Sequence, residues 1–220
     1  TDLIMITPML TYWYLGVWDV IGIIRRQFPG VPVVLGGNYV TLCPQHASGS
    51  GADICLPGPA ENSISSLLKD LFNMEMTFMP DKNNLDSYPY PAFDLIRSRD
   101  QIPIMTSRGC PYRCSYCASH LLNPNFQRRN PFRVVDEIEY WHKHYGVSHF
   151  SFYDDALLVE SSEMAIPLLE EIIHRNLHVE FHCPNGLHLR EITAEVSMLM
   201  FKAGFRTIRF GFETDDLVKQ

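Results

Sequence analysis

Three cysteines lie close together in the middle of the chain, at positions Cys110, Cys114 and Cys117. Their C-x3-C-x2-C spacing lets three thiolates converge on a single soft metal centre. A metal centre with three protein ligands keeps one coordination position without a protein ligand. That open position is where a substrate can bind.

The residues around the cysteines favour a tight loop with compensated charge. Gly109 and Pro111 let the backbone fold sharply. Arg108 and Arg113 offset the negative charge of the thiolates. The stretch therefore predicts a loop that binds a metal cluster.

This loop resembles the signature of radical S-adenosylmethionine (SAM) enzymes, in which three cysteines hold a 4Fe-4S cluster. In that family SAM chelates the fourth iron through its amino and carboxylate groups. The resemblance implies that Cys110, Cys114 and Cys117 are the cluster ligands, and Tyr116 fits the aromatic position before the last cysteine. It also implies reductive cleavage of SAM, after which a 5'-deoxyadenosyl radical abstracts hydrogen from an unreactive carbon of a small-molecule substrate. An electron donor of the flavodoxin or ferredoxin type is then expected.

A structural zinc site is the alternative for the same loop. His120 stands at C-x2-H spacing from Cys117 and could complete a set of three cysteines and one histidine. Structural zinc usually pairs two knuckles across a longer span, which favours the cluster. Disulfides are disfavoured because three clustered cysteines leave an odd thiol.

Length and composition bound the class of protein. At 220 residues and 46% hydrophobic content, the chain can bury one sizeable core or two small ones. The net charge of -7 gives no basic surface for nucleic acid. No apolar run approaches the roughly 20 residues that span a bilayer. The six cysteines suit a reducing cytosol, so we expect a soluble cytoplasmic protein.

Short apolar runs and amphipathic stretches alternate in the first third of the chain. Strands are expected at residues 2–7, 31–35 and 53–56, and helices at 14–28 and 63–72. This alternation predicts a parallel, Rossmann-like α/β sheet.

Glycine turns follow two of these strands and give the region a second resemblance. Gly36 and Gly37 follow one strand, and Gly58 with Glu61 precedes a helix. These turns resemble those of the cobalamin-binding domain that precedes many radical SAM domains. The resemblance implies that Gly36, Gly37 and Gly58 approach the cofactor. The alternative is an ordinary strand-end turn.

The other candidate ligands of this region favour structural roles. His46 is expected to be a surface histidine rather than a cobalt ligand, and Cys43 and Cys55 to be small buried hydrophobic residues. Cobalamin would then bind without a protein ligand to cobalt.

Residues 74–101 contain several prolines, a polar run and little periodicity, so we expect a connection between two domains. The cobalamin-binding-type domain would occupy residues 1–73. The radical SAM domain would occupy residues 102–220.

The second domain repeats the strand and helix pattern. Strands are expected at residues 102–106, 148–153, 178–183 and 205–212, with helices at 134–145, 162–176 and 193–204. The resemblance implies part of a (β/α)6 radical SAM barrel. The cysteine loop would leave the carboxyl end of the first strand, where such folds place their chemistry.

Acidic residues follow two of these strands. Asp154 and Asp155 could bind the hydroxyls or the ammonium of SAM, although an Asp also caps helices, and we expect one of the two to be functional. Glu213 resembles the family position where an acidic residue approaches SAM, with an exposed turn glutamate as the alternative.

The remaining candidates near the loop are three arginines and a thiol. Arg128, Arg129 and Arg133 are expected to steady the loop or a carboxylate, or else to be solvated. Cys183 is expected to be a buried thiol.

Four strands instead of six, and a first domain that lacks its opening strand and helix, suggest a piece of a longer enzyme. Such a piece is expected to expose a sheet edge. Cobalamin-dependent methyl transfer is the preferred reaction. The alternatives are a radical SAM methylthiotransferase-like enzyme and a non-enzymatic iron-sulfur or zinc protein.

Overall fold

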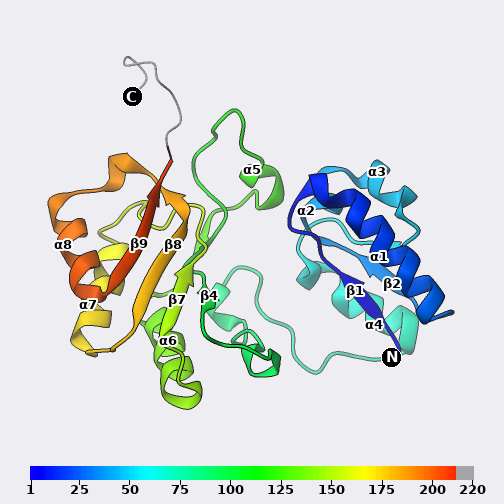
Figure 1. Cartoon of the computed structure of the whole chain (residues 1–220), viewed down its shortest axis with the longest axis horizontal. Coiled ribbons are helices and arrows are strands. Elements are labelled where there is room, and N and C mark those ends of the chain that lie inside the picture. The colour runs from blue at the N-terminus through cyan, green and yellow to red at the C-terminus, as the bar shows by residue number, and fades with distance from the viewer. Residues whose placement is uncertain (212–220) are drawn as a thin grey trace. The chain divides into compact units, whose positions relative to one another are not determined.

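The computed structural model describes residues 1–211, which divide into two compact units (Figure 1). One unit comprises residues 1–80 with 121–123, and the other comprises residues 81–120 with 124 onward. None of the helices in the described part is long and apolar enough to cross a membrane.

The first unit is built on a three-stranded parallel sheet whose order follows the chain. Its central strand is buried along its whole length, which explains its continuous run of valine and leucine. The expected strands and long helices are confirmed as β1 (Ile4–Ile6), β2 (Val33–Leu35), β3 (Ile54–Cys55), α1 (Tyr14–Gln27) and α4 (Ile64–Phe72).

Two short helices, α2 (Gly37–Leu42) and α3 (Pro44–Ala47), follow β2 and were not predicted. Gly36 and Gly37, at the start of α2, are residues typical of loops, so the sequence does not indicate a helix there. Helix α3 is a single turn with proline at its first position. Tyr39 and Val40 of α2 are buried and join the core of the first unit. These helices therefore fix the backbone just beyond the carboxyl end of β2.

The second unit contains a four-stranded parallel sheet, again in chain order (Figure 1). Each strand is joined to its neighbour through a helix, and neighbouring helices pack on one another. This is the repeating strand and helix pattern that the sequence predicts. Its elements are β4 (Ile102–Ile104), α6 (Pro131–Tyr145), β7 (His149–Phe152), α7 (Ala165–His174), β8 (Glu180–Leu187), α8 (Ala194–Ala203) and β9 (Phe205–Phe210).

Side chains alternate between the two faces of this sheet. Phe150, Phe152 and Phe181 are buried in one core with the apolar residues of α6, α7 and α8. By the two-residue period of a strand, His149 and His182 belong to the opposite face, and both are partly exposed. The helices therefore cover one face of the sheet.

The third strand of this sheet differs from its prediction. Pro184, Asn185 and Gly186 were expected to close it, but β8 continues through them to Leu187. The register with β9 shifts between Cys183 and Gly186, which accommodates the proline as an irregularity inside the strand. Helix α7 starts at Ala165, three residues later than the sequence indicates, so that Pro167 lies in its first turn, where a proline is tolerated.

The predicted connection is divided in the structure. Residues 81–101 group with the second unit, where Asp86 accepts a hydrogen bond from the backbone of Asn130 at 2.6 Å and Phe93 packs edge-on against Trp141. Residues 73–79, by contrast, are all exposed. The extended stretch between the units is therefore shorter than the sequence indicates.

Candidate functional site

The cysteine loop begins just beyond the carboxyl end of β4. A short antiparallel pair, β5 (Ser107–Arg108) with β6 (Gln127–Arg128), closes the loop at its base. Gly109 follows β5 with a φ of 84°, a conformation that favours glycine. In Figure 1 the loop beyond β4 leaves from the end of the sheet toward which the arrows of β7, β8 and β9 point.

Asp154, which follows β7, binds the residues at the start of this loop. Its side chain is buried, and its Oδ1 accepts hydrogen bonds from the backbone N–H of Thr106 at 2.9 Å and of Ser107 at 2.6 Å. The hydroxyls of the same two residues also donate to Oδ1, at 2.8 and 2.7 Å. Burial raises the pKa of Asp154, and these donors oppose that shift. Asp154 thus joins the carboxyl ends of β4 and β7 and positions the loop.

The three cysteines line a single cavity of about 280 Å³. Two residues that the sequence singles out, Tyr116 and Asp155, line the same cavity. Asp154 does not appear among the described lining residues, so only the second aspartate of the pair reaches this space. The full lining is Cys110, Tyr112, Cys114, Tyr116, Cys117, Ser119, Asp155, Gly186, Leu187, His188 and Gly211.

A short helix, α5 (Ser119–Leu122), ties the third cysteine to the carboxylate. The backbone N–H of Ser119 donates to the Sγ of Cys117 at 3.4 Å, and its hydroxyl donates to Asp155. The N–H of Cys117 in turn donates to the carbonyl of Cys114 at 3.0 Å. The loop is therefore ordered by its own polar contacts.

The three thiols can be compared with the requirements of a single zinc ion. Thiolates on one tetrahedral zinc, at Zn–S of about 2.3 Å, lie within about 4 Å of one another. In the part of the chain that the structure describes, the three cysteines do not form a group whose ligand atoms all lie within 4.8 Å of one another, with or without His120. Burial raises the pKa of the Cys110 thiol most. The negative charges of Asp155 and the other two cysteines raise this pKa further. Three thiols that line one cavity could reach separate irons of one cluster, and the irons would compensate their charge.

Tyr112 attaches the cysteine loop to the segment after β8. Its hydroxyl donates to Glu191 at 2.5 Å, and the guanidinium carbon of Arg190 lies 4.4 Å from its ring centre. Its ring also contacts that of His188, with 5.0 Å between centres. Burial and the hydrogen bond to Glu191 raise the pKa of Tyr112 to about 12, so the phenol keeps its proton and donates.

Sequence reasoning missed this side of the cavity. Leu187 and His188 line it because β8 runs on through Gly186, where the sequence predicted the strand to end. A Cβ on Gly186 would lie 3.0 Å from the backbone nitrogen of Gly211, so the two glycines let the ends of β8 and β9 approach closely. The signal available in the sequence was the position of these residues at a strand's carboxyl end.

The candidate arginines bind protein carboxylates instead of lining the cavity. Arg128 pairs with Glu160 at 2.6 Å and Glu163 at 3.2 Å, both in the segment after β7. Arg133 is exposed and contacts Asp136 within its own helix at 3.5 Å. Among the three, only Arg128 belongs to the strand pair that closes the cysteine loop.

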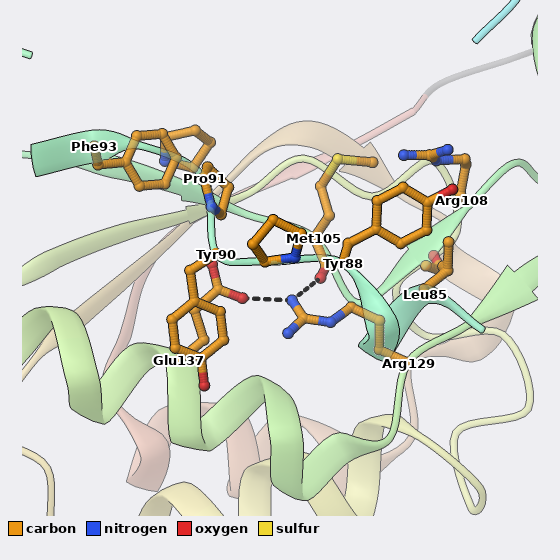
Figure 2. A pocket seen from close by; sticks show the side chains of 12 residues that line it. Leu85, Tyr88, Tyr90, Pro91, Phe93, Met105, Arg108, Arg129 and Glu137 are labelled. Atoms are coloured by element: carbon orange, nitrogen blue, oxygen red, sulfur yellow. Dashed lines mark hydrogen bonds and ion pairs between the residues drawn. The ribbon is translucent and has the colours of Figure 1, made fainter. Parts of the chain in front are cut away.

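A second cavity, of about 250 Å³, lies between the segment 85–93, strand β4 and helix α6 (Figure 2). Figure 2 shows Arg129 in this cavity, donating to Glu137 at 2.6 Å and to the carbonyl of Met105 at 3.1 Å. Arg129 also pairs with Asp86 at 3.2 Å. Burial raises the pKa of Glu137, and the charge of Arg129 opposes this. Arg129 is thus neutralised by Asp86 and Glu137. These ion pairs help to hold residues 85–93 on the second unit.

The two glycine turns of the first unit, at Gly36 with Gly37 and at Gly58, follow the carboxyl ends of the adjacent strands β2 and β3. A Cβ on Gly37 would lie 2.6 Å from Thr7 Oγ1, and one on Gly36 would lie 3.6 Å from the carbonyl of Leu56. The N–H of Gly58 donates to Thr41 Oγ1 at 2.9 Å. Gly37 is therefore required by the packing of its own chain, whereas a Cβ on Gly58 would meet nothing within 4 Å.

The histidine of this unit has structural partners. His46 Nδ1 lies 2.6 Å from the hydroxyl of Tyr39, and its ring stacks on Trp18 with 5.3 Å between centres. Cys43 and Cys55 pack against the core as half-buried residues. In the second unit Cys183 is buried, which raises the pKa of its thiol to about 12. Glu213 lies outside the described residues.

Known proteins similar to this chain include several methyltransferases. An uncharacterised methyltransferase of Pyrococcus horikoshii is 25% identical over 97% of this chain and 52% of its own length. Bacteriochlorophyllide d C-8(2)-methyltransferase of Chlorobaculum tepidum is 29% identical over 56% of this chain and 32% of its own. Hopanoid C-2 methylase of Rhodopseudomonas palustris is 24% identical over 84% and 37%. The chain thus spans about half the length, or less, of these relatives, and no family model matches it.

The fold matches that of a solved radical SAM methyltransferase, TsrM from Kitasatospora setae. The structure with tryptophan and a SAM analogue superimposes with a TM-score of 0.77 at 19% identity, over 99% of this chain and 50% of TsrM. A second structure of TsrM contains cobalamin and a 4Fe-4S cluster, and gives a TM-score of 0.74. The chain therefore has the fold of this half of TsrM, and it is similar in sequence to methyltransferases along most of its length.

Proposed function

We propose that the protein cleaves SAM reductively at a 4Fe-4S cluster held by Cys110, Cys114 and Cys117. The observation that carries this proposal is the cavity that all three cysteines share with Asp155. The donor set fits the cluster, because three thiols line one space and cysteine thiolates are the usual ligands of iron-sulfur clusters. The fourth iron would have no protein ligand in this arrangement and would be open to SAM.

The residues around the cavity would bind and orient SAM. Asp155 presents a carboxylate to the cavity and is held there by the hydroxyl of Ser119, so it can accept a hydrogen bond from the ammonium or the ribose of SAM. Tyr116 supplies an aromatic face beside the last cysteine. Leu187 narrows the apolar side of the cavity and would help to exclude water from the reacting bond.

The chemistry itself belongs to the bound cofactors: the reduced cluster supplies the electron that cleaves SAM. The chain would contribute by positioning the cluster and SAM. Asp154 and Tyr112 would do so by fixing the two sides of the cysteine loop. Methyl transfer is the proposed overall reaction, supported by the names of the relatives. A flavodoxin- or ferredoxin-type protein is the proposed electron donor, and the cytoplasm the proposed location.

Cobalamin is the proposed second cofactor, bound at the glycine edge of the first unit. The turns at Gly36, Gly37 and Gly58 bring three strand ends together, which is where parallel α/β sheets bind ligands. Because the ring of His46 packs against Tyr14 and stacks on Trp18 of its own unit, cobalamin would bind without this histidine on cobalt. His46→Ala is therefore expected to leave the absorption spectrum of the bound cobalamin unchanged. A spectrum that shifts in this variant would contradict that part of the proposal.

The test of SAM cleavage is formation of 5'-deoxyadenosine by the full-length, anaerobically reconstituted protein with a chemical reductant. We expect product with the parent protein and at least about a tenfold loss with Asp155→Asn, whose amide binds an ammonium poorly. Asp70→Asn, at an exposed position of α4, is the control and should retain the parent rate. A parent protein that holds its cluster and binds SAM but forms no 5'-deoxyadenosine would overturn the proposal.

A further inference from the structure

Three metal-ligating side chains meet on the sheet face that α6, α7 and α8 leave uncovered. His149 is the first residue of β7 and Glu180 the first residue of β8, and the two are paired in the parallel register. His182 lies two residues after Glu180 and so shares its face. All three side chains are partly buried.

Their ligand atoms converge on one point. His149 Nδ1 lies 3.3 Å from His182 Nε2 and 3.7 Å from Glu180 Oε2, and all the ligand atoms are within 4.8 Å of one another. Two nitrogens bound to one zinc ion at about 2.1 Å, with a tetrahedral angle between them, are about 3.4 Å apart. The observed separation of the two imidazole nitrogens therefore suits a shared ion.

Neighbouring side chains hold two of the three ligands in place. His182 Nδ1 lies 3.2 Å from Thr207 Oγ1 on β9, and when Nδ1 donates its proton there, Nε2 carries a lone pair toward His149. Arg206 Nε donates to Glu180 Oε1 at 3.3 Å, which leaves Oε2 facing the histidines. Such outer contacts are typical of built metal sites.

We propose that His149, Glu180 and His182 form a binding site for a divalent first-row transition ion such as Zn²⁺. Two imidazoles and one carboxylate are ligands that this class of ion prefers, and three protein ligands leave a position for water. The ion would link β7 to β8 at the amino ends of the strands, the side of the sheet that Figure 1 shows opposite the arrowheads.

This site is separate from the cysteine cavity. His149 starts β7, whereas Asp155 comes six residues later, beyond the strand's carboxyl end. At about 3.3 Å per residue, strand β7 alone places its two ends about 10 Å apart, and Asp155 lies beyond the far end. The ion would therefore stabilise the sheet without contacting SAM.

The test is calorimetric titration of Zn²⁺ into the full-length protein with its cluster already assembled, so that the thiols are occupied. We expect one Zn²⁺ per chain and a rise in melting temperature on binding. His149→Ala and His182→Ala should each weaken binding at least about tenfold, and Thr207→Val should weaken it less, with rescue by Thr207→Ser. In the Cu²⁺-loaded protein, electron paramagnetic resonance should show two nitrogen ligands, and one in His182→Ala.

The matched control is His174, which stands 3.8 Å from Glu171 without belonging to a described three-ligand group. His174→Ala should bind Zn²⁺ like the parent. Circular dichroism and melting without metal would show that the His149 and His182 variants are folded. Two results would overturn the proposal: equal Zn²⁺ affinity in folded His182→Ala and parent, or no binding at millimolar Zn²⁺. Either would show that the three residues form only a hydrogen-bonded polar cluster.

Discussion

Two neighbouring carboxylates after β7 have opposite surroundings, and we propose different roles for them on this basis. Asp154 is buried under Thr106 and Ser107, whereas Asp155 is exposed and lines the cysteine cavity. The sequence predicts that one of the two aspartates is functional. It does not show which one, because that depends on which side chain is covered by the residues that follow β4. That contact joins residues 47 and 48 positions apart, so local patterns do not reveal it.

The two aspartates should therefore respond differently to the same substitution. Asp154→Asn leaves backbone N–H groups of the loop with a weaker acceptor, and we expect a loss of about 2 kcal/mol in the free energy of unfolding. Asp155→Asn should unfold like the parent but bind SAM more weakly. Denaturant unfolding and SAM titration of both variants check this, and equal stability of the two variants would contradict the assignment.

Tyr112 offers a second test at the residue scale. Tyr112→Phe removes the hydroxyl that donates to Glu191 but keeps the ring against His188. We expect a loss of about 1 kcal/mol in unfolding free energy and faster loss of the cluster in air. The exposed Tyr12→Phe serves as control. A Tyr112→Phe protein with parental melting and cluster lifetime would show that this contact does not hold the loop.

At the scale of elements, Asp53 links three parts of the first unit. Its Oδ2 accepts from the N–H of Val33 on β2 at 2.7 Å, and its Oδ1 pairs with Arg25 of α1 at 2.8 Å. The hydrogen bond from Val33, with Arg25 in support, lowers the pKa of Asp53 below its ordinary value of 3.8. The ionised carboxylate is thus favoured in the folded state.

This shift makes the stability of the first unit depend on acid pH. Because the folded-state pKa of Asp53 is depressed, its contribution is present above pH 3.8 and is lost as the pH falls below that value. Asp53→Asn should cost about 1 kcal/mol at neutral pH, since the side chain is half exposed. Thermal melts across pH check this. A deficit that persists undiminished well below pH 3.8 would contradict it.

The long elements could be predicted from sequence because each carries its own signal. Buried strands such as β2 are continuous apolar runs, and α6 has Asn130 as its cap and Gly146 at its end. The pair β5 and β6 could not be predicted, because two-residue strands have no periodicity and depend on contacts between distant segments. Helix α2 could not be predicted, because it begins with glycines, which are unfavourable in helices.

At the scale of the whole molecule, the chain forms two units joined by an exposed stretch. That the three cysteines line one cavity could be predicted, because they lie close together in one short loop. The rest of the cavity could not, because Leu187 and His188 reach it only through the irregular continuation of β8. The connection predicted at residues 74–101 extends too far, because Pro89 and Pro91 are residue types typical of linkers. In the structure both line a cavity of the second unit.

Limited proteolysis tests this placement of the connection. Chymotrypsin should cut the full-length protein first after Phe78, which is 55% exposed, and not after Phe93, which packs against Trp141. Mass spectrometry of early fragments identifies the site. A first cut within residues 81–101 would show that this segment is not held on the second unit.

The measurement that tests the central claim most directly is the spectroscopy of the cluster. Anaerobically reconstituted full-length protein should contain about four irons and four sulfides, and the electron paramagnetic resonance signal of its reduced form should change when SAM is added. Alanine at any one of Cys110, Cys114 or Cys117 should abolish the SAM-sensitive signal, while Cys43→Ala should keep it. A stoichiometric zinc ion that depends on His120, or a cluster signal that ignores SAM, would contradict the account.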